Sequence, residues 1–228
     1  ILAVTDISKL YVDSSATGYN TGLNWTDAFT SLQDALLFSD CRFDTICVAQ
    51  GTYYPDTAFY HVLTNNDRNL SFDIPDSTVV LGGFPSGGGN ISDRNWVCNK
   101  TILCGDIDQS GTLANNSYHV VTTNAVGTLT VVDGFCITGG YADNTGGNGF
   151  VKYGGGWLNR GVGGIESSPM IINCVFNNNQ TGTSNVNNDN FGGGAFASFA
   201  NDGNTNPTLI NCILHNNLSL KGGAIRTY

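Results

Sequence analysis

Apolar residues in the last third of the chain recur two positions apart, in short bursts separated by Asn- and Gly-rich segments. Such alternation is typical of a β-strand with one buried face, while Gly, Asn, Ser and Thr are unfavourable inside helices. The pattern therefore predicts short strands joined by Asn-rich turns. The two clearest bursts are Ile172, Cys174 and Phe176, and Ile210, Cys212 and Leu214.

These bursts belong to an imperfect tandem repeat. Residues 155–179 align with residues 193–217 at a lag of 38 (193 minus 155), and a third copy begins at Gly222. Strand-forming repeats of this length stack as coils about 4.8 Å apart, so equivalent residues lie on one another. We therefore predict a parallel β-helix. The matched pairs are Pro169 with Pro207, Ile172 with Ile210, Asn173 with Asn211, Cys174 with Cys212, Phe176 with Leu214, and Asn179 with Asn217.

The repeat also carries a motif in which Gly precedes a small and an aliphatic or aromatic residue, followed elsewhere by Phe-x-x-Asn. Examples are Gly223-Ala224-Ile225, Gly194-Ala195-Phe196, and Phe176 with Asn179. In the front half, the segments KLYVDSSATGYN, ICVAQGTYYPD, VVLGGF, TILCGDID, NSYHVVT and VVDGFCITGG follow in order. In these features the chain resembles right-handed parallel β-helix proteins with polymorphic-outer-membrane-protein-type repeats, which are secreted bacterial surface proteins. The resemblance implies an all-β, right-handed solenoid and a non-catalytic adhesin or passenger.

Residues 25–39 show the only convincing helical period. Thr26 is the expected N-cap, and Asp27 lies in the first turn, where an acidic residue is favourable. We expect this helix to cap the first coil and hide its unpaired strand edges. Residues 1–50 would then hold the N-terminal strand, the capping helix and the first coil, and residues 51–228 the β-helix. The capping residues are Trp25, Phe29, Leu32 and Leu36.

The residues from Lys221 to Tyr228 read as the opening strand of a coil that is incomplete or covered by a partner. Either further repeats follow, or another copy of the protein covers this edge. Residues 1–4 are apolar and could add to a neighbour's edge by β-augmentation. Head-to-tail contacts of this kind do not close and therefore build filaments. The candidate assembly residues are Ile1, Leu2, Ala3, Val4, Ala224, Ile225 and Tyr228.

The composition fits a protein that works at the cell surface or in the extracellular space. Charged residues make up only 12% of the chain, the formal net charge is −9, and 30 residues are Gly. The nine basic residues are scattered, so the sequence predicts no partner among nucleic acids or anionic lipids. No apolar run approaches the length of a membrane-spanning helix.

Seven cysteines also favour an oxidising compartment. For the stacked pair Cys174 and Cys212, an inward ladder of free thiols is an equal alternative to a disulfide. Cys136 is the odd cysteine. The alignment places Phe135 over Cys174, which turns Cys136 to the opposite face of its strand. The candidate disulfides are Cys41 with Cys47, Cys98 with Cys104, and Cys174 with Cys212.

Candidate catalytic residues are few. Glycoside hydrolysis needs two carboxylates that face one groove, and the acidic residues of the solenoid do not repeat at the coil period. The histidines are isolated, and no nucleophile elbow or phosphate loop is present. We therefore expect no enzyme. A polysaccharide lyase or hydrolase is the distant alternative and would require clustered Asp beside Arg160 or Lys152. The acids considered are Asp133, Asp143, Glu166, Asp189 and Asp202, and the histidines are His61, His119 and His215.

One segment has the opening of a calcium loop. Asp106, Asp108 and Ser110 precede Gly111 in a D-x-D-x-S-G pattern, but the twelfth position holds Ser117 in place of a bidentate Glu. An Asx-turn at a coil corner is the alternative. We expect no cofactor other than this possible structural calcium.

Seven Asn-x-Ser/Thr sequons are candidate glycosylation sites, and glycans there would coat the turns of the solenoid. They begin at Asn24, Asn69, Asn90, Asn99, Asn115, Asn179 and Asn217.

Together these patterns predict a secreted, non-enzymatic β-helix protein with a structural or adhesive task, and a subunit that assembles head to tail into an extracellular filament. A monomeric surface adhesin that binds glycan or protein is the closest alternative. It would present an aromatic patch, for which Trp157, Tyr141 and Tyr153 are the candidates.

Overall fold

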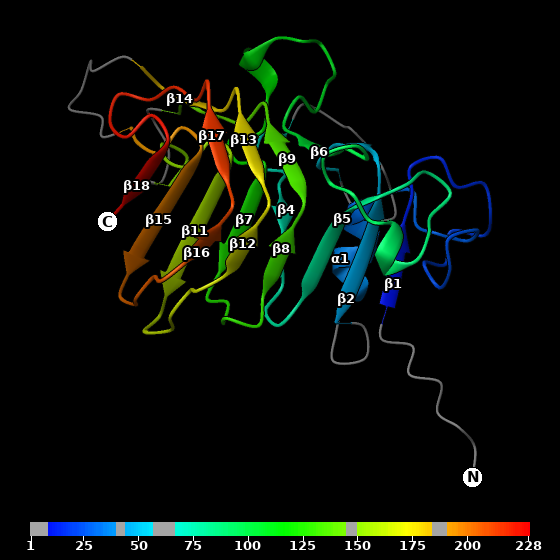
Figure 1. The fold of residues 1–228 in the computed structure, drawn as a ribbon. Coiled ribbons are helices and arrows are strands. Elements are labelled where there is room, and N and C mark those ends of the chain that lie inside the picture. Colours follow the sequence, from blue (N-terminus) through cyan, green and yellow to red (C-terminus); the bar gives the residue numbers. More distant parts are fainter. Residues whose placement is uncertain (1–8, 40–43, 57–66, 145–149, 184–190) are drawn as a thin grey trace.

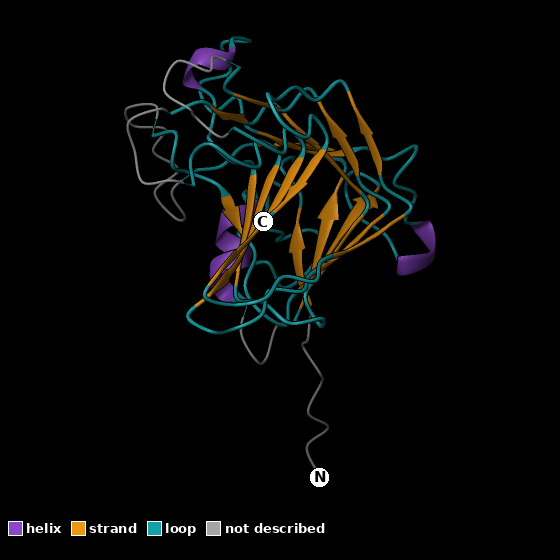
Figure 2. Cartoon of the chain, turned by 90° about the vertical axis from the view of Figure 1, so that its left-hand side faces the viewer, coloured by secondary structure: helices purple, strands orange, loops and turns teal. Residues whose placement is uncertain are grey.

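The computed structural model describes residues 9–39, 44–56, 67–144, 150–183 and 191–228. In this part of the chain the strands form a parallel β-solenoid (Figures 1 and 2). Three sheets run along the molecule, and successive turns of the chain add strands to each of them. The predicted all-β parallel β-helix with an N-terminal helix is therefore confirmed.

The strands of each sheet pair in parallel with the equivalent strands of neighbouring turns. The first sheet contains β1 (Lys9–Val12), β2 (Thr45–Ala49), β5 (Val79–Phe84), β8 (Val131–Asp133), β12 (Met170–Ile172) and β16 (Thr208–Ile210). The second contains β3 (Gly51–Tyr53), β6 (Thr101–Cys104), β9 (Phe135–Thr138), β13 (Val175–Asn177) and β17 (Ile213–His215). The third contains β4 (Phe72–Asp73), β7 (Val121–Asn124), β11 (Trp157–Val162), β15 (Phe196–Asn201) and β18 (Ile225–Thr227).

Short elements complete the turns. β10 (Tyr141–Ala142) and β14 (Gln180–Thr181) form a small fourth sheet. Two 3-10 helices lie in the connections: η1 (Ile91–Asp93) follows β5, and η2 (Leu113–Asn115) follows β6. Within the described residues, no helix is both long and apolar enough to span a bilayer.

The predicted register holds in the first two sheets. Ile172 pairs with Ile210, and Phe176 pairs with both Leu214 and Ile137. Cys136 pairs with Val175 and faces outward, as the alignment predicts. The third sheet departs from this lag.

In the third sheet Trp157 pairs with Phe196, which is a lag of 39 (196 minus 157), and the following loop restores the lag of 38. The slip places two large rings on one another in the core, with centroids 6.2 Å apart. The Trp157 indole also donates a hydrogen bond to Thr123 Oγ1 at 2.9 Å, which satisfies its buried N–H.

Asn residues form the corners, as their sequence positions predict. Asn173 and Asn211 adopt φ of 52° between the first and second sheets, and Asn178 and Asn216 adopt 51° and 54° one corner later. This left-handed conformation is accessible to Asn and Gly. Gly134 adopts it, with φ of 89°, at the equivalent corner of the preceding coil.

The helix is shorter than predicted. α1 (Leu32–Phe38) begins after its N-cap Ser31, whose Oγ accepts from the Gln33 N–H, so Thr26 is not the N-cap. The preceding segment is instead held in an extended contact with β1, because Phe29 N–H donates to the Tyr11 carbonyl. Hydrogen bonding to the sheet thus overrides the helical period of residues 25–31.

Its capping position is confirmed. α1 packs against β1, β2 and β4 at the N-terminal end of the solenoid (Figure 1). Leu32, Ala35 and Leu36 are buried in the continuous core. Trp25 is not on this face: its indole donates to the Gly89 carbonyl and packs against Phe84.

Candidate functional site: a groove on the second sheet

A groove of about 610 Å³ lies on the outer face of the second sheet. Since Phe135 and Phe176 point into the core, the alternate residues of β9, β13 and β17 point outward. Register then stacks these side chains in two rows along the solenoid axis. The first row is Cys136, Val175 and Ile213, and the second is Thr138, Asn177 and His215.

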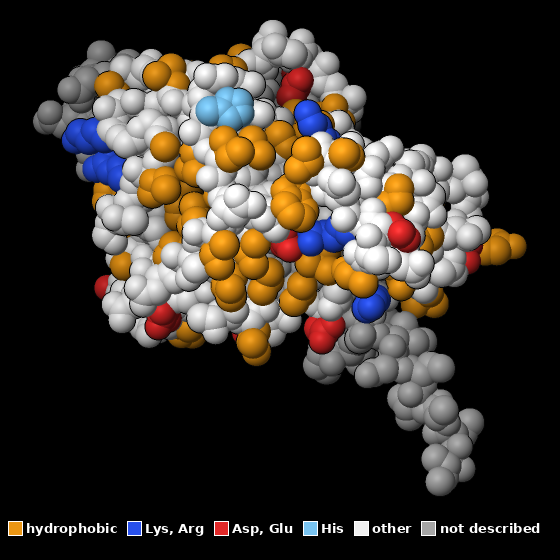
Figure 3. All heavy atoms as spheres, viewed as in Figure 1, with side chains coloured by type: hydrophobic (Ala, Val, Ile, Leu, Met, Phe, Trp, Pro, Cys, Tyr) orange, Lys and Arg blue, Asp and Glu red, His pale blue; other side chains and the backbone are white. Residues whose placement is uncertain are grey.

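The connection between β5 and β6 forms one wall of the groove. Trp96, Val97 and Lys100 line it, and the side chains of Trp96 and Val97 are 37% and 66% exposed. On the floor, Ile213 is 58% exposed. Figure 3 shows hydrophobic side chains gathered on this face of the molecule. Contiguous exposed apolar surface of this kind marks interaction sites in soluble proteins.

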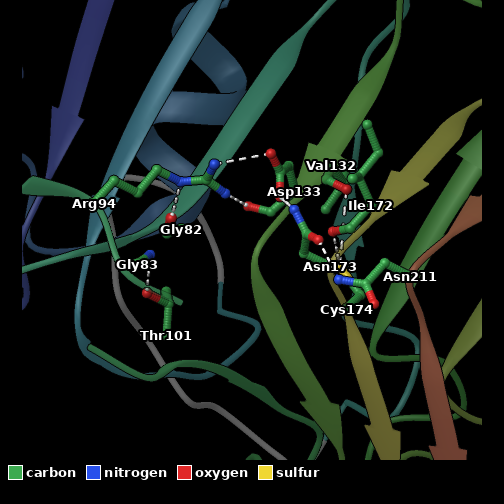
Figure 4. Close-up of polar contacts among 10 residues, drawn as sticks. All are labelled: Gly82, Gly83, Arg94, Thr101, Val132, Asp133, Ile172, Asn173, Cys174 and Asn211. Carbon is green, nitrogen blue, oxygen red and sulfur yellow. Dashed lines mark hydrogen bonds and ion pairs between the residues drawn. The ribbon is translucent and has the colours of Figure 1, made fainter. Parts of the chain in front are cut away.

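A chain of polar side chains runs from Arg94 to Asn211 and forms one edge of the groove, which Asn173 and Asn211 line (Figure 4). Arg94 donates to the Asp133 carboxylate at 2.8 Å and also to the carbonyls of Gly82 and Asp133. Asn173 donates to the other oxygen of that carboxylate at 2.8 Å, and Asn211 donates to Asn173 Oδ1 at 2.6 Å. The edge is therefore one continuous hydrogen-bonded row.

The carboxylate at one end orients this row. Asp133 only accepts hydrogen bonds when ionised, so Asn173 must present its amide nitrogen to it and its oxygen to Asn211. The ion pair is largely buried, with side-chain exposures of 11% for Arg94 and 15% for Asp133. The direction of hydrogen-bond donation along the row is therefore set by the Arg94 and Asp133 ion pair.

The predicted disulfides are wrong where the structure describes both partners. Cys98 and Cys104 are free. Cys104 is the last residue of β6, whose extended backbone places it about 10 Å along the sheet from Thr101, so the length of the strand separates it from Cys98 in the preceding turn. Cys47 is likewise a free, buried thiol, so its predicted pairing with Cys41, which lies outside the described residues, is also wrong.

Cys174 and Cys212 are also free and form the predicted alternative, a ladder of thiols. Cys174 Sγ lies 3.2 Å from the Ile172 carbonyl oxygen, and Cys212 Sγ lies 3.4 Å from that of Ile171. Stacked side chains in parallel register point the same way, so each thiol meets backbone carbonyls and not the other sulfur. Burial raises the pKa of Cys174 to about 12.

The predicted calcium ligands form a hydrogen-bonded turn. Asp106 Oδ2 accepts from the Gly111 N–H at 2.9 Å, and Asp108 Oδ2 accepts from Asn115 Nδ2 at 2.9 Å. The Asn115 bond lowers the pKa of Asp108. Ser110 Oγ lies 2.9 Å from Thr112 Oγ1. Across the described residues, no three His, Cys, Asp or Glu side chains gather as a metal site.

The acidic side chains have separate partners. Asp143 pairs with Arg68 at 2.6 Å, and Glu166 Oε1 accepts from Asn206 at 2.9 Å. The Arg160 guanidinium lies 3.8 Å from the centre of the Phe150 ring. His119 Nδ1 lies 3.0 Å from the Gly154 carbonyl, and burial lowers the pKa of this ring to about 4. Asp189 and His61 lie outside the described residues.

The aromatic patch has different members from those predicted. Trp157 is buried in the core, and Tyr141 packs beside Arg68. Tyr153 joins Phe199 and Tyr228 on the outer face of the third sheet, with ring centroids 4.8 to 5.7 Å apart. The sequence analysis did not include Phe199. It lies three residues after the inward-facing Phe196 in β15, and this alternation places its side chain on the outer face of the sheet.

The sequons differ in accessibility. Asn24, Asn69 and Asn90 are exposed, and Asn99, Asn115 and Asn217 are half-buried. Asn179 is fully buried, and its amide donates to the carbonyl of Ile137 and to Asn217 Oδ1. It cannot carry a glycan without opening the coil.

The candidate assembly residues at the C-terminal end are partly engaged. The Ala224 carbonyl accepts from the backbone of Ala195 and Phe196, while the Ile225 side chain is 44% exposed. Tyr228 belongs to the aromatic patch. Residues 1–4 lie outside the described part of the chain. Comparison with family models, curated proteins and solved structures gives no significant match to this chain.

Proposed function

We propose that this is a secreted, non-enzymatic surface protein whose solenoid serves as an adhesive scaffold. Its features are similar to those of polymorphic-outer-membrane-protein-type β-helix proteins, and its low charge content suits an extracellular setting. The observation that carries the proposal is the groove on the second sheet. It offers an apolar floor, an exposed indole and amide groups on a rigid stack of strands, which is the chemistry of a binding site.

Variants of the floor test this function without disturbing the core. Val175 and Ile213 both face outward, so replacing each with Glu changes the groove and leaves the inward side chains in place. The wild-type protein and the double variant are applied to an array of glycans and extracellular matrix proteins. We expect the variant to lose the ligands that the wild type retains.

Leu129→Glu is the matched control, because Leu129 is 70% exposed and does not line the groove. It should bind as the wild type does. Retention of all ligands by the groove variant would refute the proposal.

Head-to-tail assembly is the second candidate function. Among the described residues, β16, β17 and β18 each stand at the end of their sheet, with a partner strand on one side only. Such edges are templates for strand addition by another chain. A structural calcium and glycans on the exposed sequons would be compatible with both roles.

A further inference from the structure

The groove contains several polar groups that no other part of the described chain engages. The Lys100 ammonium, the His215 ring and Asn211 Oδ1 form no hydrogen bond or ion pair among the described residues. Asn177 Nδ2 donates to Cys136 Sγ at 3.5 Å, which leaves its Oδ1 without a hydrogen bond among the described residues. Around an apolar floor, these groups are therefore free to bind a ligand.

The wall that holds the indole is fixed in place. Asn95 N–H and Asn99 Nδ2 both donate to the Gly83 carbonyl, at 2.7 and 3.1 Å. Gly83 N–H in turn donates to Thr101 Oγ1 at 2.9 Å (Figure 4). A side chain on Gly83 would meet the Trp96 backbone at 2.8 Å, so only glycine allows this close approach. The groove is thus pre-organised, which lowers the entropic cost of binding.

The local charge of the groove is opposite to that of the whole protein. The chain has a net charge of −9, yet Arg94 is neutralised by Asp133 and leaves Lys100 as the ionised side chain that lacks a partner in the groove. An acidic ligand group gains from this ammonium, while a basic peptide would be attracted to other surfaces.

The floor also repeats along the axis. Each turn offers one apolar side chain and one polar side chain, at a spacing of about 4.8 Å between strands. A polymer of sugars presents apolar C–H faces beside hydroxyl edges at a similar repeat, and amides such as Asn177 bind hydroxyls as both donor and acceptor. An indole is a suitable platform for the C–H face of a sugar ring.

We propose that this groove binds an acidic oligosaccharide along the solenoid axis, with Trp96 stacked on one ring and Lys100 paired with a carboxylate. This inference rests on the proposed adhesive function and names its ligand class.

The test is calorimetry with oligosaccharides of galacturonate and of glucuronate, each beside its carboxyl-reduced neutral counterpart. The acidic forms should bind at least about tenfold more tightly than the neutral ones. Lys100→Met should abolish that difference, whereas Trp96→Ala should weaken both forms about tenfold. Lys9→Met and Tyr19→Ala are the controls, since both residues are exposed and outside the groove.

The outcomes separate this inference from the function on which it rests. Equal binding of acidic and neutral sugars, lost on Trp96→Ala, would refute the acidic ligand and leave the adhesive groove intact. Binding of extended peptides alone, lost in the Val175 and Ile213 variant, would also refute only the oligosaccharide. If no ligand binds and no groove variant has an effect, both proposals fail.

Discussion

Asp133 joins parts of the chain that are far apart in the sequence. Its carboxylate holds Arg94, 39 residues earlier, and Asn173, 40 residues later. Each contact fixes a different feature: the first ties the groove wall to the corner, and the second orients the row of Asn amides. At the scale of single residues, one carboxylate thus links the segment that forms the groove wall to the Asn row.

We expect Asp133→Asn to destabilise the protein by about 3 kcal/mol, because the largely buried Arg94 guanidinium would lose its counter-ion. Urea unfolding measures this change. Asp202→Asn is the control: Asp202 is exposed and has φ of 61°, a conformation that Asn also adopts, so the change should be within about 0.5 kcal/mol. Equal stabilities of the two variants would contradict the assigned role of Asp133.

The raised pKa of the buried Cys174 thiol predicts that the protein loses stability at alkaline pH. Burial raises the pKa of this thiol from the ordinary value of 9.0 to about 12 in the folded protein, so between these values the unfolded chain releases a proton that the folded chain keeps. The stabilisation of the folded state by the protonated thiol is fully present below pH 9.0. The free energy of unfolding then declines by about 1.4 kcal/mol per pH unit as the pH rises toward 12.

Urea titrations at several pH values test this, with Cys174→Ala compared with wild type. The variant should show a shallower alkaline decline, whereas replacing the exposed Cys98 with Ala should leave the slope unchanged. An unaltered slope in Cys174→Ala would show that the thiol ionises as readily in the folded state.

At the scale of elements, the third sheet shows how packing adjusts a repeat. The sequence lag of 38 would place Trp157 beside Ala195, but the slip by one residue brings it onto Phe196. Trp157 also lies 6.4 Å from Phe176, so its indole connects the inner faces of two sheets. Burial of three rings outweighs strict periodicity in β11 and β15.

We expect Trp157→Ala to cost about 3 to 5 kcal/mol, since the side chain is completely buried and its loss leaves a cavity. Trp157→Phe should cost less and still leave Thr123 Oγ1 without its indole donor. Thermal unfolding of both variants checks the order. A cost below about 1 kcal/mol for the Ala variant would place the ring outside the core.

The region before α1 shows where a helical period misleads. Phe29, Leu32 and Leu36 recur at helical spacing, yet Phe29 is bonded to β1 and α1 starts only after Ser31. Phe29, Leu32 and Leu36 are buried here, as they would be on one face of a longer helix, so their spacing cannot separate the two arrangements. The backbone contact with β1 decides between them.

At the scale of the whole molecule, assembly depends on the sides of β16, β17 and β18 that have no partner strand among the described residues. If copies add head to tail, electron microscopy of the untagged protein should show regular filaments. Removing residues 1–4, while leaving the solenoid intact, should abolish them. Monodisperse single particles of residues 1–228 would refute assembly and leave the groove as the functional surface.

The sequence by itself determined the solenoid and much of its register. Alternating apolar residues, Asn corners and the lag between copies predict which residues stack, such as Cys174 on Cys212, because neighbouring turns repeat the same local interactions. The outward direction of Cys136 follows from the same alignment.

Only the tertiary structure decided where the groove lies and what forms it. Its wall comes from the connection between β5 and β6, which has no counterpart in the repeat, and no local pattern predicts that Trp96 and Lys100 face β13 and β17. The Arg94 and Asp133 contact likewise depends on the corner geometry of separate turns. Periodicity predicts what recurs along a solenoid, whereas the groove is built from a single non-repeating segment that packs on the repeat.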